Sequence, residues 1–296
     1  MKRLWFVLSL LVAAPAWAME VVATTSSMGM LARTVGGPQV KVTELAPPDR
    51  DAHMLQARPS MMRALRDASL LVAVGAELEI GWLPVVLRDS GNAGIQPGQS
   101  GYFEAARYVT LLDVPAVLDR AQGDVHAAGN PHIQLDPRNF FRIGEALAAR
   151  MGELDPPNAA AYQAGYKAFA EKWQAAIARW EKEAAPLRGV PVLVHHASFV
   201  YLAHWLGLKE TGTLEPKPGV EPSSGQLTAL LARQQSVPAR MVLRTAYQSD
   251  GPSLWIAGKA GIPAVMLPFT VGGTPEAGDL FGLFDDSIRR LLKGLN

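Results

Sequence analysis

Histidines are the residues of this 296-residue chain best suited to chemistry, and there are six of them. Three positions lie in loops or at a strand end, far apart in the chain: His53, His132 and the pair His195-His196. Imidazole suits zinc and neighbouring transition metals, whereas manganese and magnesium favour carboxylate oxygens. The residue types therefore permit a metal site built from distant segments, although the chain has neither an HExxH helix nor a compact zinc-knuckle spacing.

The neighbouring residues indicate which of the histidines are candidates for metal ligands. In GNPHIQLDPRN (129–139), Asp136 followed by Pro137 is typical of a helix N-cap, so we interpret Asp136 as a cap and not as a ligand. Side chains alternate along the predicted strand VPVLVHH (190–196), so only one of its two histidines can face a cleft. We expect His204 to be a hydrogen-bonded core residue and His126 to be a solvated loop residue.

Strand and helix patterns alternate along the chain. Strands are predicted at 20–27, 41–46, 69–75 and 108–114, and then at 190–196, 208–215, 239–247 and 263–269. Helices are predicted near 28–35, 59–68, 80–88, 139–151, 197–206, 224–233 and 279–292. This alternation indicates an α/β fold of two lobes, each with a mainly parallel sheet flanked by helices. Ligands of such sheets usually bind beyond the carboxyl ends of the strands.

One long amphipathic helix is predicted between the two halves. Its apolar residues recur every three or four positions, at Ala159, Tyr162, Tyr166, Phe169, Trp173, Ile177 and Trp180. Residues 159–183 would form a rod of roughly 37 Å. We therefore expect an N-terminal lobe over 19–155, a connecting helix over 156–186 and a C-terminal lobe over 187–296.

Residues 1–18 are typical of an export signal. Lys2 and Arg3 precede an apolar run, and Ala16-Trp17-Ala18 predicts cleavage after Ala18. Losing the two basic residues changes the formal charge from +1 to about −1, so we expect no binding to nucleic acid or to an anionic membrane. Cysteine is absent, which excludes disulfides, thiolate ligands and lipid attachment through cysteine. We expect a soluble protein of the periplasm.

Several segments, in order along nearly the whole mature chain, resemble the metal-binding substrate-binding proteins of ABC transporters, the periplasmic zinc and manganese receptors. These segments are VVATTSSMGMLARTVGG (21–37), DAHMLQARPSMMRALRDASLLVAVGAELE (51–79), NPHIQLDPRN (130–139), VLVHHASFVYLAHWLGL (192–208) and EPKPGVEPSS (215–224). The resemblance implies two α/β lobes joined by a long helix, no enzymatic activity, and delivery of captured metal to an ABC permease in the inner membrane. We expect a monomer, and whether a periplasmic metal chaperone supplies the metal stays open.

The resemblance also implies metal ligands at His53, His132 and His196. It selects His196 over His195 because the aromatic residues that follow match the family's pattern. Manganese receptors of the family tend to carry a carboxylate at the third position, where this chain has histidine. Zn(2+) is therefore the expected ion, with Mn(2+) as the alternative.

The fourth ligand is where this chain departs from the family pattern. An acidic residue is expected after the last strand, but residues 270–273 read TVGG. Asp279 is expected either to reach the metal or to be an N-cap, and Glu276, water or His126 are the substitutes.

Other functions stay open at this point. One is a manganese or iron receptor of the same family. Another is a periplasmic zinc hydrolase with Glu215 or Glu221 as general base, because three histidines and an open position are also a catalytic arrangement. A third is a protein that has lost its metal and serves as an adhesin.

Overall fold

Apolar runs in the first half of the chain pair into one parallel sheet. The computed structural model describes residues 18–115 and 126–296 and orders these strands β2-β1-β3-β4, which are Val40–Glu44, Met19–Ala23, Leu70–Ala73 and Tyr102–Glu104. Side chains of β1 and β3 alternate between two apolar clusters, one on each face of the sheet. Helices α1 (Ser26–Gly36) and α4 (Asn139–Leu154) cover one face, and α2 (Pro59–Arg66) and α3 (Leu83–Ser90) cover the other.

The second half repeats this plan. Its parallel strands have the order β6-β5-β7-β8 and are Lys209–Thr213, Pro191–Val194, Met241–Thr245 and Ala264–Leu267. Helices α6 (Val200–Leu206) and α9 (Leu280–Leu295) pack on one face. Helices α7 (Ser224–Arg233) and α8 (Gly251–Ala260) pack on the other. The predicted fold class is confirmed.

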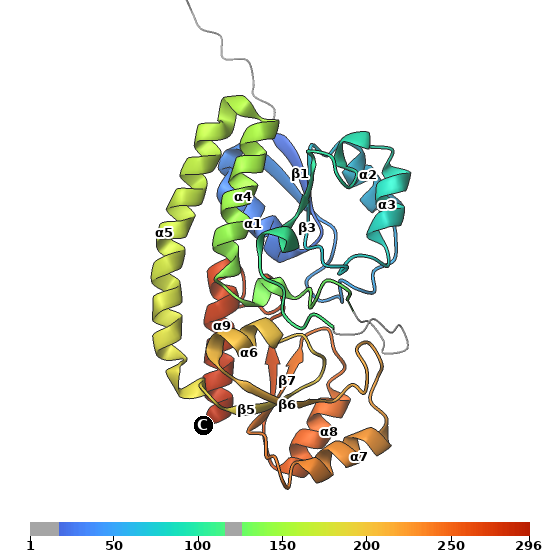
Figure 1. Ribbon diagram of the computed structural model, residues 1–296, viewed down its shortest axis with the longest axis vertical. Helices are drawn as coiled ribbons and strands as arrows, with labels where there is room; N and C mark the ends of the chain where they lie inside the picture. The colour runs from blue at the N-terminus through green and yellow to red at the C-terminus, as the bar shows by residue number, and fades with distance from the viewer. Residues whose placement is uncertain (1–17, 116–125) are drawn as a thin grey trace, which may run out of the picture.

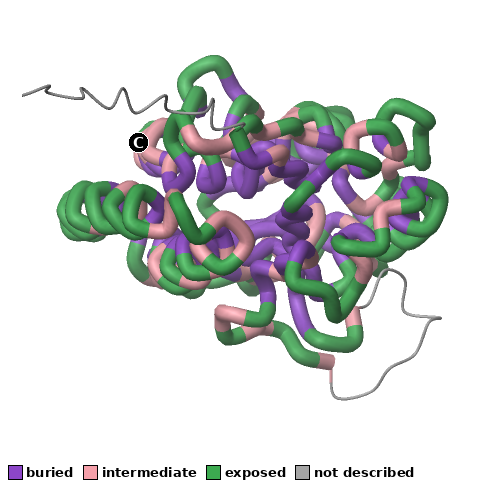
Figure 2. The backbone as a smooth tube through the Cα atoms, turned by 90° about the horizontal axis from the view of Figure 1, so that it is seen from above, coloured by how far each residue is buried: buried purple, intermediate pink, exposed green. Residues whose placement is uncertain are grey.

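Helix α5 (Ala159–Glu183) runs along both lobes, as Figure 1 shows. Its N-terminal half packs on α1 and α4, and its C-terminal half packs on α9. An aromatic cluster holds the latter contact, with the ring centroid of Trp173 lying 4.8 Å from that of Phe281 and 5.6 Å from that of Phe284. Figure 2 shows the buried backbone gathered inside the layers of helices, so both lobes share one continuous interior. The predicted helix over 159–183 is confirmed, and the three-part division at 155 and 186 stays a prediction.

Two elements differ from the sequence predictions. Residues 108–114 were expected to form the fourth strand, but that strand is the shorter β4, and Leu112 donates its N–H to the hydroxyl of Tyr201 on α6 (3.1 Å). Helix α8 was not predicted, because its sequence opens with Gly-Pro and leaves Leu254 and Trp255 exposed, which breaks the apolar stripe.

The ends of two predicted segments can also be compared. Helix α4 begins at Asn139, as predicted, but its N-cap is Arg138 and not Asp136, whose carboxylate instead accepts a hydrogen bond from the N–H of Arg138 (2.9 Å). The predicted signal segment falls almost entirely on residues outside the described range. Among the described helices, none is both long and apolar enough to cross a bilayer.

Candidate metal centre

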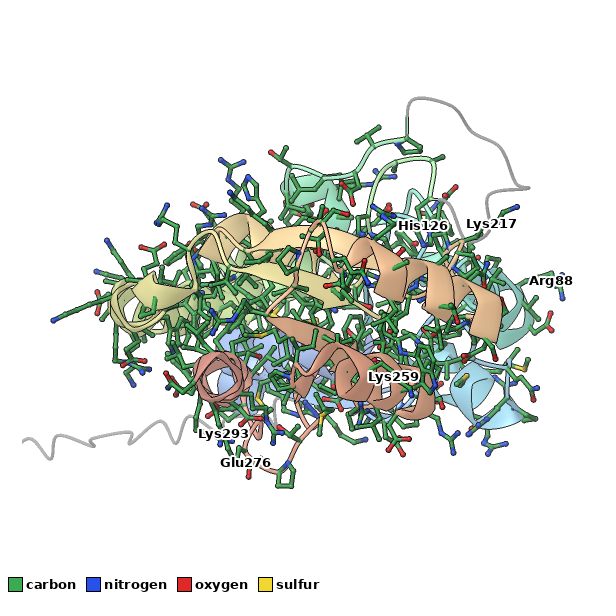
Figure 3. All side chains as sticks on the ribbon, turned by 90° about the horizontal axis from the view of Figure 1, so that it is seen from below. Arg88, His126, Lys217, Lys259, Glu276 and Lys293 are labelled. Atoms are coloured by element: carbon green, nitrogen blue, oxygen red, sulfur yellow. The ribbon has the colours of Figure 1, made fainter. Side chains whose placement is uncertain are left out.

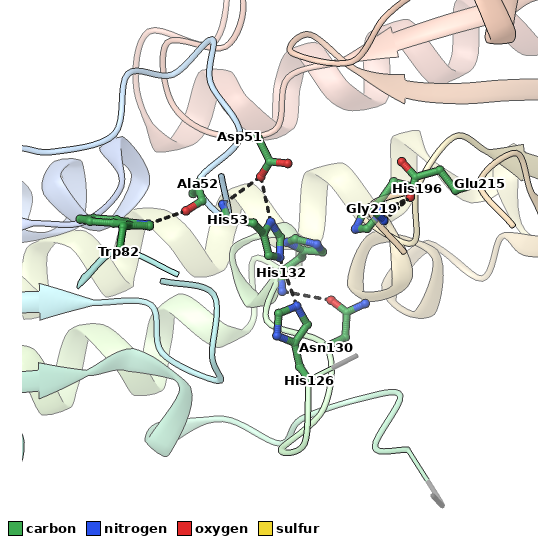
Figure 4. Close-up of polar contacts among 10 residues, drawn as sticks. All are labelled: Asp51, Ala52, His53, Trp82, His126, Asn130, His132, His196, Glu215 and Gly219. Carbon is green, nitrogen blue, oxygen red and sulfur yellow. Dashed lines mark hydrogen bonds and ion pairs between the residues drawn. The ribbon is translucent and has the colours of Figure 1, made fainter. Parts of the chain in front are cut away.

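Four histidines meet between the two lobes, as Figure 4 shows. The ring centroid of His53 lies 5.1 Å from that of His126, 5.1 Å from that of His132 and 6.1 Å from that of His196. The centroids of His132 and His196 are 5.6 Å apart. Four imidazoles bound tetrahedrally to zinc, with Zn–N distances of about 2.0–2.1 Å, would place their centroids about 5 Å apart. The rings therefore lie near the spacing of zinc ligands.

The ring nitrogens of the four histidines are not arranged as a complete coordination sphere. The Nε2 atoms of His53 and His126 are 3.2 Å apart, close to the edge of roughly 3.3 Å in a tetrahedral zinc site. Among the described residues, however, no three His, Asp or Glu side chains are already arranged as a complete metal-binding group. For these four pairs, binding would require movements of about 1 Å, since the largest of their centroid separations, 6.1 Å, exceeds the tetrahedral value by about that much.

His53 is held by the loop between β2 and α2. The buried indole of Trp82 donates to the carbonyl of Ala52 (2.7 Å) and fixes the loop next to His53. Asp51 Oδ1 accepts from the backbone N–H of His53 (2.9 Å) and lies 2.8 Å from its Nδ1. Burial alone would raise the pKa of Asp51, but hydrogen bonds and charge attraction from His53 outweigh it and lower that pKa. An ionised Asp51 keeps the proton of His53 on Nδ1, which leaves the Nε2 lone pair for a metal.

His132 is the buried ligand candidate, with 1% of its surface exposed. The backbone N–H of His132 donates to Asn130 Oδ1 (3.0 Å). The Nδ2 of the same Asn130 donates to the carbonyl of Ala197 in the other lobe (2.8 Å). The ring packs edge-on against Phe269, with centroids 5.0 Å apart. Burial, followed by the neighbouring imidazoles, holds the pKa of His132 well below its usual range. The ring is therefore neutral at neutral pH, as a metal ligand must be.

The two nitrogens of the His132 ring differ in their surroundings. Its Nδ1 is buried and has no hydrogen-bond partner among the described residues, whereas the other two predicted ligands each have a carboxylate on Nδ1. A buried nitrogen without a partner costs free energy, so this ring is held in place by its packing and by Asn130 and not by a bond to its own Nδ1.

His196 follows strand β5 and faces the other histidines. Its Nδ1 lies 2.7 Å from Glu215 Oε2, and the same oxygen accepts from the N–H of Gly219 (2.8 Å). His195 points elsewhere, since its Nδ1 lies 3.0 Å from the Ser253 hydroxyl on α8. The alternation of side chains along β5 thus brings His196 and not His195 to the cluster.

The acidic residues after the last strand have other partners. Asp279 is exposed and is the N-cap of α9, where its carboxylate accepts from the N–H of Gly282 (2.7 Å). Glu276 pairs with Arg290 (3.1 Å). Of the two roles expected for Asp279, the structure therefore gives it that of the N-cap.

His126, which we expected in a solvated loop and kept as a substitute for the fourth ligand, lies beside His53 in the structure. The sequence signal was weak, because a histidine in a glycine-containing loop has no periodicity that fixes its direction. His204, expected in the core, is exposed on α6, with its Nδ1 3.4 Å from a guanidinium nitrogen of Arg138. Asp51 was also missed, because its role depends on how its loop folds back on His53.

Two relatives of the chain show how much of its length is matched by known proteins. The metal ABC transporter substrate-binding lipoprotein SloC of Streptococcus mutans is 21% identical over 286 residues, which is 94% of this chain and 90% of that protein. The high-affinity zinc uptake system protein ZnuA of Brucella abortus is 29% identical over 111 residues, or 38% of this chain and 33% of that protein.

Solved structures share the fold. A crystal structure of ZnuA has a TM-score of 0.77 at 23% identity and covers 94% of this chain and 100% of that one. The substrate-binding protein FpvC of P. aeruginosa, in complex with Ni2+, has a TM-score of 0.79 at 20% identity and covers 94% and 97%. The family described as zinc-uptake complex component A, periplasmic, matches residues 21–294. This chain therefore belongs to the ZnuA family of metal-binding substrate-binding proteins of ABC transporters.

Proposed function

We propose that this protein is a receptor for a divalent transition metal, with zinc as the preferred ion, and that it delivers the ion to an ABC importer. The observation that carries the proposal is that the imidazoles of His53, His132 and His196, from both lobes, lie near ligand spacing, with that of His126 beside His53. We propose His53, His132, His196 and His126 as the ligands, and leave out Asp279 because it caps α9.

The choice of zinc rests on the ligand chemistry. Four neutral nitrogen ligands suit zinc, nickel and their neighbours, whereas manganese prefers several oxygen ligands. Names of the matched proteins include a zinc uptake protein, a nickel complex and a manganese-bound protein from candidatus Liberibacter asiaticus. A manganese or iron receptor is therefore the alternative, and it would need oxygen ligands that the gathered rings do not supply.

A hydrolase is not supported. Members of the family are transporter receptors without enzymatic activity, so the expectation of a non-enzyme is confirmed. Glu215, the candidate general base, is already hydrogen-bonded to His196 and Gly219. We infer that its role is to orient a ligand.

The cellular location and the oligomeric state are further parts of the proposal. We propose that the chain is exported, cleaved after Ala18 and active as a monomer in the periplasm, where it meets the permease of its importer. A periplasmic metal chaperone as a further partner stays open.

The test is a metal titration of the metal-stripped protein. Zinc, nickel and manganese affinities would be measured by competition with a chelator for the wild type and for His53→Ala, His132→Ala and His196→Ala. We expect each substitution to weaken zinc binding at least about 10-fold, because one of the ligands is lost. His204→Ala is the matched control and should bind like the wild type. Unchanged zinc affinity in all three variants would overturn the proposal, and tighter binding of manganese than of zinc would move it to the alternative ion.

A further inference from the structure

The segment that carries His126 is hydrogen-bonded to a turn of the N-terminal lobe. Glu77 Oε2 accepts from the N–H of Ala127, the residue after His126, at 2.7 Å. The carbonyl of His126 then accepts from the N–H of Gly129 (3.1 Å), which has a φ of 119°. Figure 3 shows His126 on the same side of the molecule as Lys217, a residue of the C-terminal lobe. His126 thus stands at the start of a tight turn, next to an N–H that Glu77 binds.

Glu77 belongs to a turn with an unusual backbone. Gly75, Ala76 and Glu77 have φ values of 83°, 49° and 65°, all in the left-handed region that residues other than glycine rarely occupy. Such a conformation persists only where the surroundings hold it. Its left-handed backbone determines the direction in which the Glu77 carboxylate leaves the turn.

Two other carboxylates hold this turn. Glu79, which is 3% exposed, accepts from the N–H of Gly75 (3.1 Å) and from that of the preceding residue (2.9 Å). Glu104 Oε1 accepts from the N–H of Ala76 (3.4 Å). A Cβ on Gly75 would lie 2.2 Å from the side chain of Glu104, so the turn packs directly on β4. Glu79 and Glu104 therefore fix the backbone of the turn that carries Glu77.

The position of His126 matters because of its geometry toward His53. Asp51 accepts the Nδ1 proton of His53, so His53 Nε2 is a hydrogen-bond acceptor and the nearby His126 Nε2, at 3.2 Å, is the donor. A metal bound between these nitrogens, with the His126 proton transferred to the Nδ1 of the same ring, would find both nitrogens at about the separation of tetrahedral ligands. Small displacements of the His126 backbone would destroy this match, since coordination distances tolerate only about 0.2 Å.

We propose that Glu77 is a positioning residue of the metal site, which holds His126 at ligand distance and so supplies the fourth nitrogen ligand. This inference rests on the proposed function. Glu77 is exposed, so its hydrogen bond contributes little to the stability of the fold. Its loss should therefore appear in metal affinity and in coordination geometry, and hardly in the unfolding temperature.

The test is a double-mutant cycle on the full chain with Zn2+ and Co2+ as probes. The variants are Glu77→Ala, Glu77→Gln, His126→Ala and the double variant Glu77→Ala/His126→Ala, with Glu153→Ala, an exposed glutamate of α4, as control. Zinc affinity would be measured by chelator competition, and the visible absorption of bound Co2+ would report the coordination geometry.

We expect Glu77→Ala to weaken zinc binding roughly 3- to 10-fold, the value of a modest hydrogen bond, and Glu77→Gln to restore most of the loss because its amide oxygen still accepts. In the His126→Ala background, Glu77→Ala should have no further effect. The Co2+ spectrum of Glu77→Ala should move toward that of His126→Ala.

Three outcomes would overturn the inference: unchanged affinity in Glu77→Ala, the same loss with and without His126, or an equal loss in Glu153→Ala. The proposed function is tested separately, by the three histidine variants. It fails only if His53→Ala, His132→Ala and His196→Ala all bind zinc normally, whatever Glu77 does.

Discussion

At the scale of residues, the site depends on which ring nitrogen of each histidine carries the proton. Asp51 and Glu215 lie against the Nδ1 atoms of His53 and His196 and keep their protons there. The opposite nitrogens are then free to bind a metal, and the carboxylates increase their basicity. Two of the proposed ligands therefore have the protonation pattern that metal binding requires.

Removing such a carboxylate should weaken the site without touching a ligand. Glu215→Ala is expected to lower zinc affinity about 10- to 100-fold, and Glu215→Gln less, because an amide oxygen still accepts the Nδ1 proton. Isothermal titration or chelator competition would measure the loss. Glu221→Ala, in the same loop, is the control, and an equal loss in both alanine variants would show that the loop and not the hydrogen bond is responsible.

Acid should destabilise the metal-free protein through His132. Its pKa in the fold lies below the unfolded value of about 6.5, so the unfolded chain takes up the proton first as the pH falls. The stability that neutral His132 contributes is complete above about pH 6.5 and declines below it, by at most about 1.4 kcal/mol per pH unit. Urea unfolding at pH 7.5, 6.5 and 5.5 should therefore show a shallower decline in His132→Gln than in the wild type. Parallel declines would contradict this assignment.

Much of the site could be predicted at this scale, and the remainder depends on loop conformation. His196 follows strand β5 closely, whereas His53 and His132 lie in loops and were identified because their segments resemble those of the family. His126 and Asp51 reach the site only through turns whose φ values and hydrogen bonds are not written in a periodic pattern. The same reason explains why Asp279 could not be separated from an N-cap on sequence alone.

At the scale of elements, regular patterns were predicted best. Helix α5 has the predicted bounds because seven apolar residues recur along one face, and α7 has them because Ser223 and Gln226 form a capping box. Helix α8 has no such stripe, and β4 is only three residues long, so both fell below what periodicity can detect.

Helix α5 offers a test of close packing through its Gly165. Alanine is normally the better helix residue by about 0.5–1 kcal/mol, but a Cβ on Gly165 would lie 2.3 Å from the carbonyl oxygen of Val35 on α1. Gly165→Ala should therefore destabilise the protein, by about 1–3 kcal/mol for an overpacked contact. Gly258 on α8 is the matched control, because its Cβ would meet nothing within 4 Å, and Gly258→Ala should stabilise. Denaturant unfolding of the two variants should give shifts of opposite sign, and stabilisation by both would refute the packing argument.

At the scale of the whole molecule, buried hydrogen bonds hold the two lobes together at the start of α1. The hydroxyl of Thr270, after β8, lies 2.9 Å from that of Ser26 and 2.7 Å from that of Ser27, both at the start of α1. Ser26 also donates to the carbonyl of Val271 (2.6 Å). With α5 spanning both lobes, this lock favours small lobe displacements on metal binding over wide hinge closure.

Breaking the lock should loosen the lobes. Thr270→Val keeps the side-chain shape but removes the hydroxyl that accepts from the buried N–H of Ser27 (3.1 Å) and contacts both serine hydroxyls, at an expected cost of about 1–3 kcal/mol. In solution scattering, the wild type should change its radius of gyration little on zinc addition, whereas Thr270→Val should start more expanded and compact more. Thr228→Val, whose hydroxyl bonds only within α7, is the control. A large compaction of the wild type would contradict the locked arrangement.

The bridge made by Asn130 gives this construction a mechanical consequence. The side chain of Asn130 accepts from the backbone N–H of His132 and donates to the carbonyl of Ala197, the residue after His196. The Tyr201 hydroxyl donates to the backbone carbonyl of Asn130 (2.7 Å). A membrane partner that bound both lobes and moved them apart would strain the Asn130 hydrogen bonds. It would thereby displace two of the proposed metal ligands, His132 and His196, at once. Separation of the lobes would then release the metal ion without a competing chelator or a fall in pH.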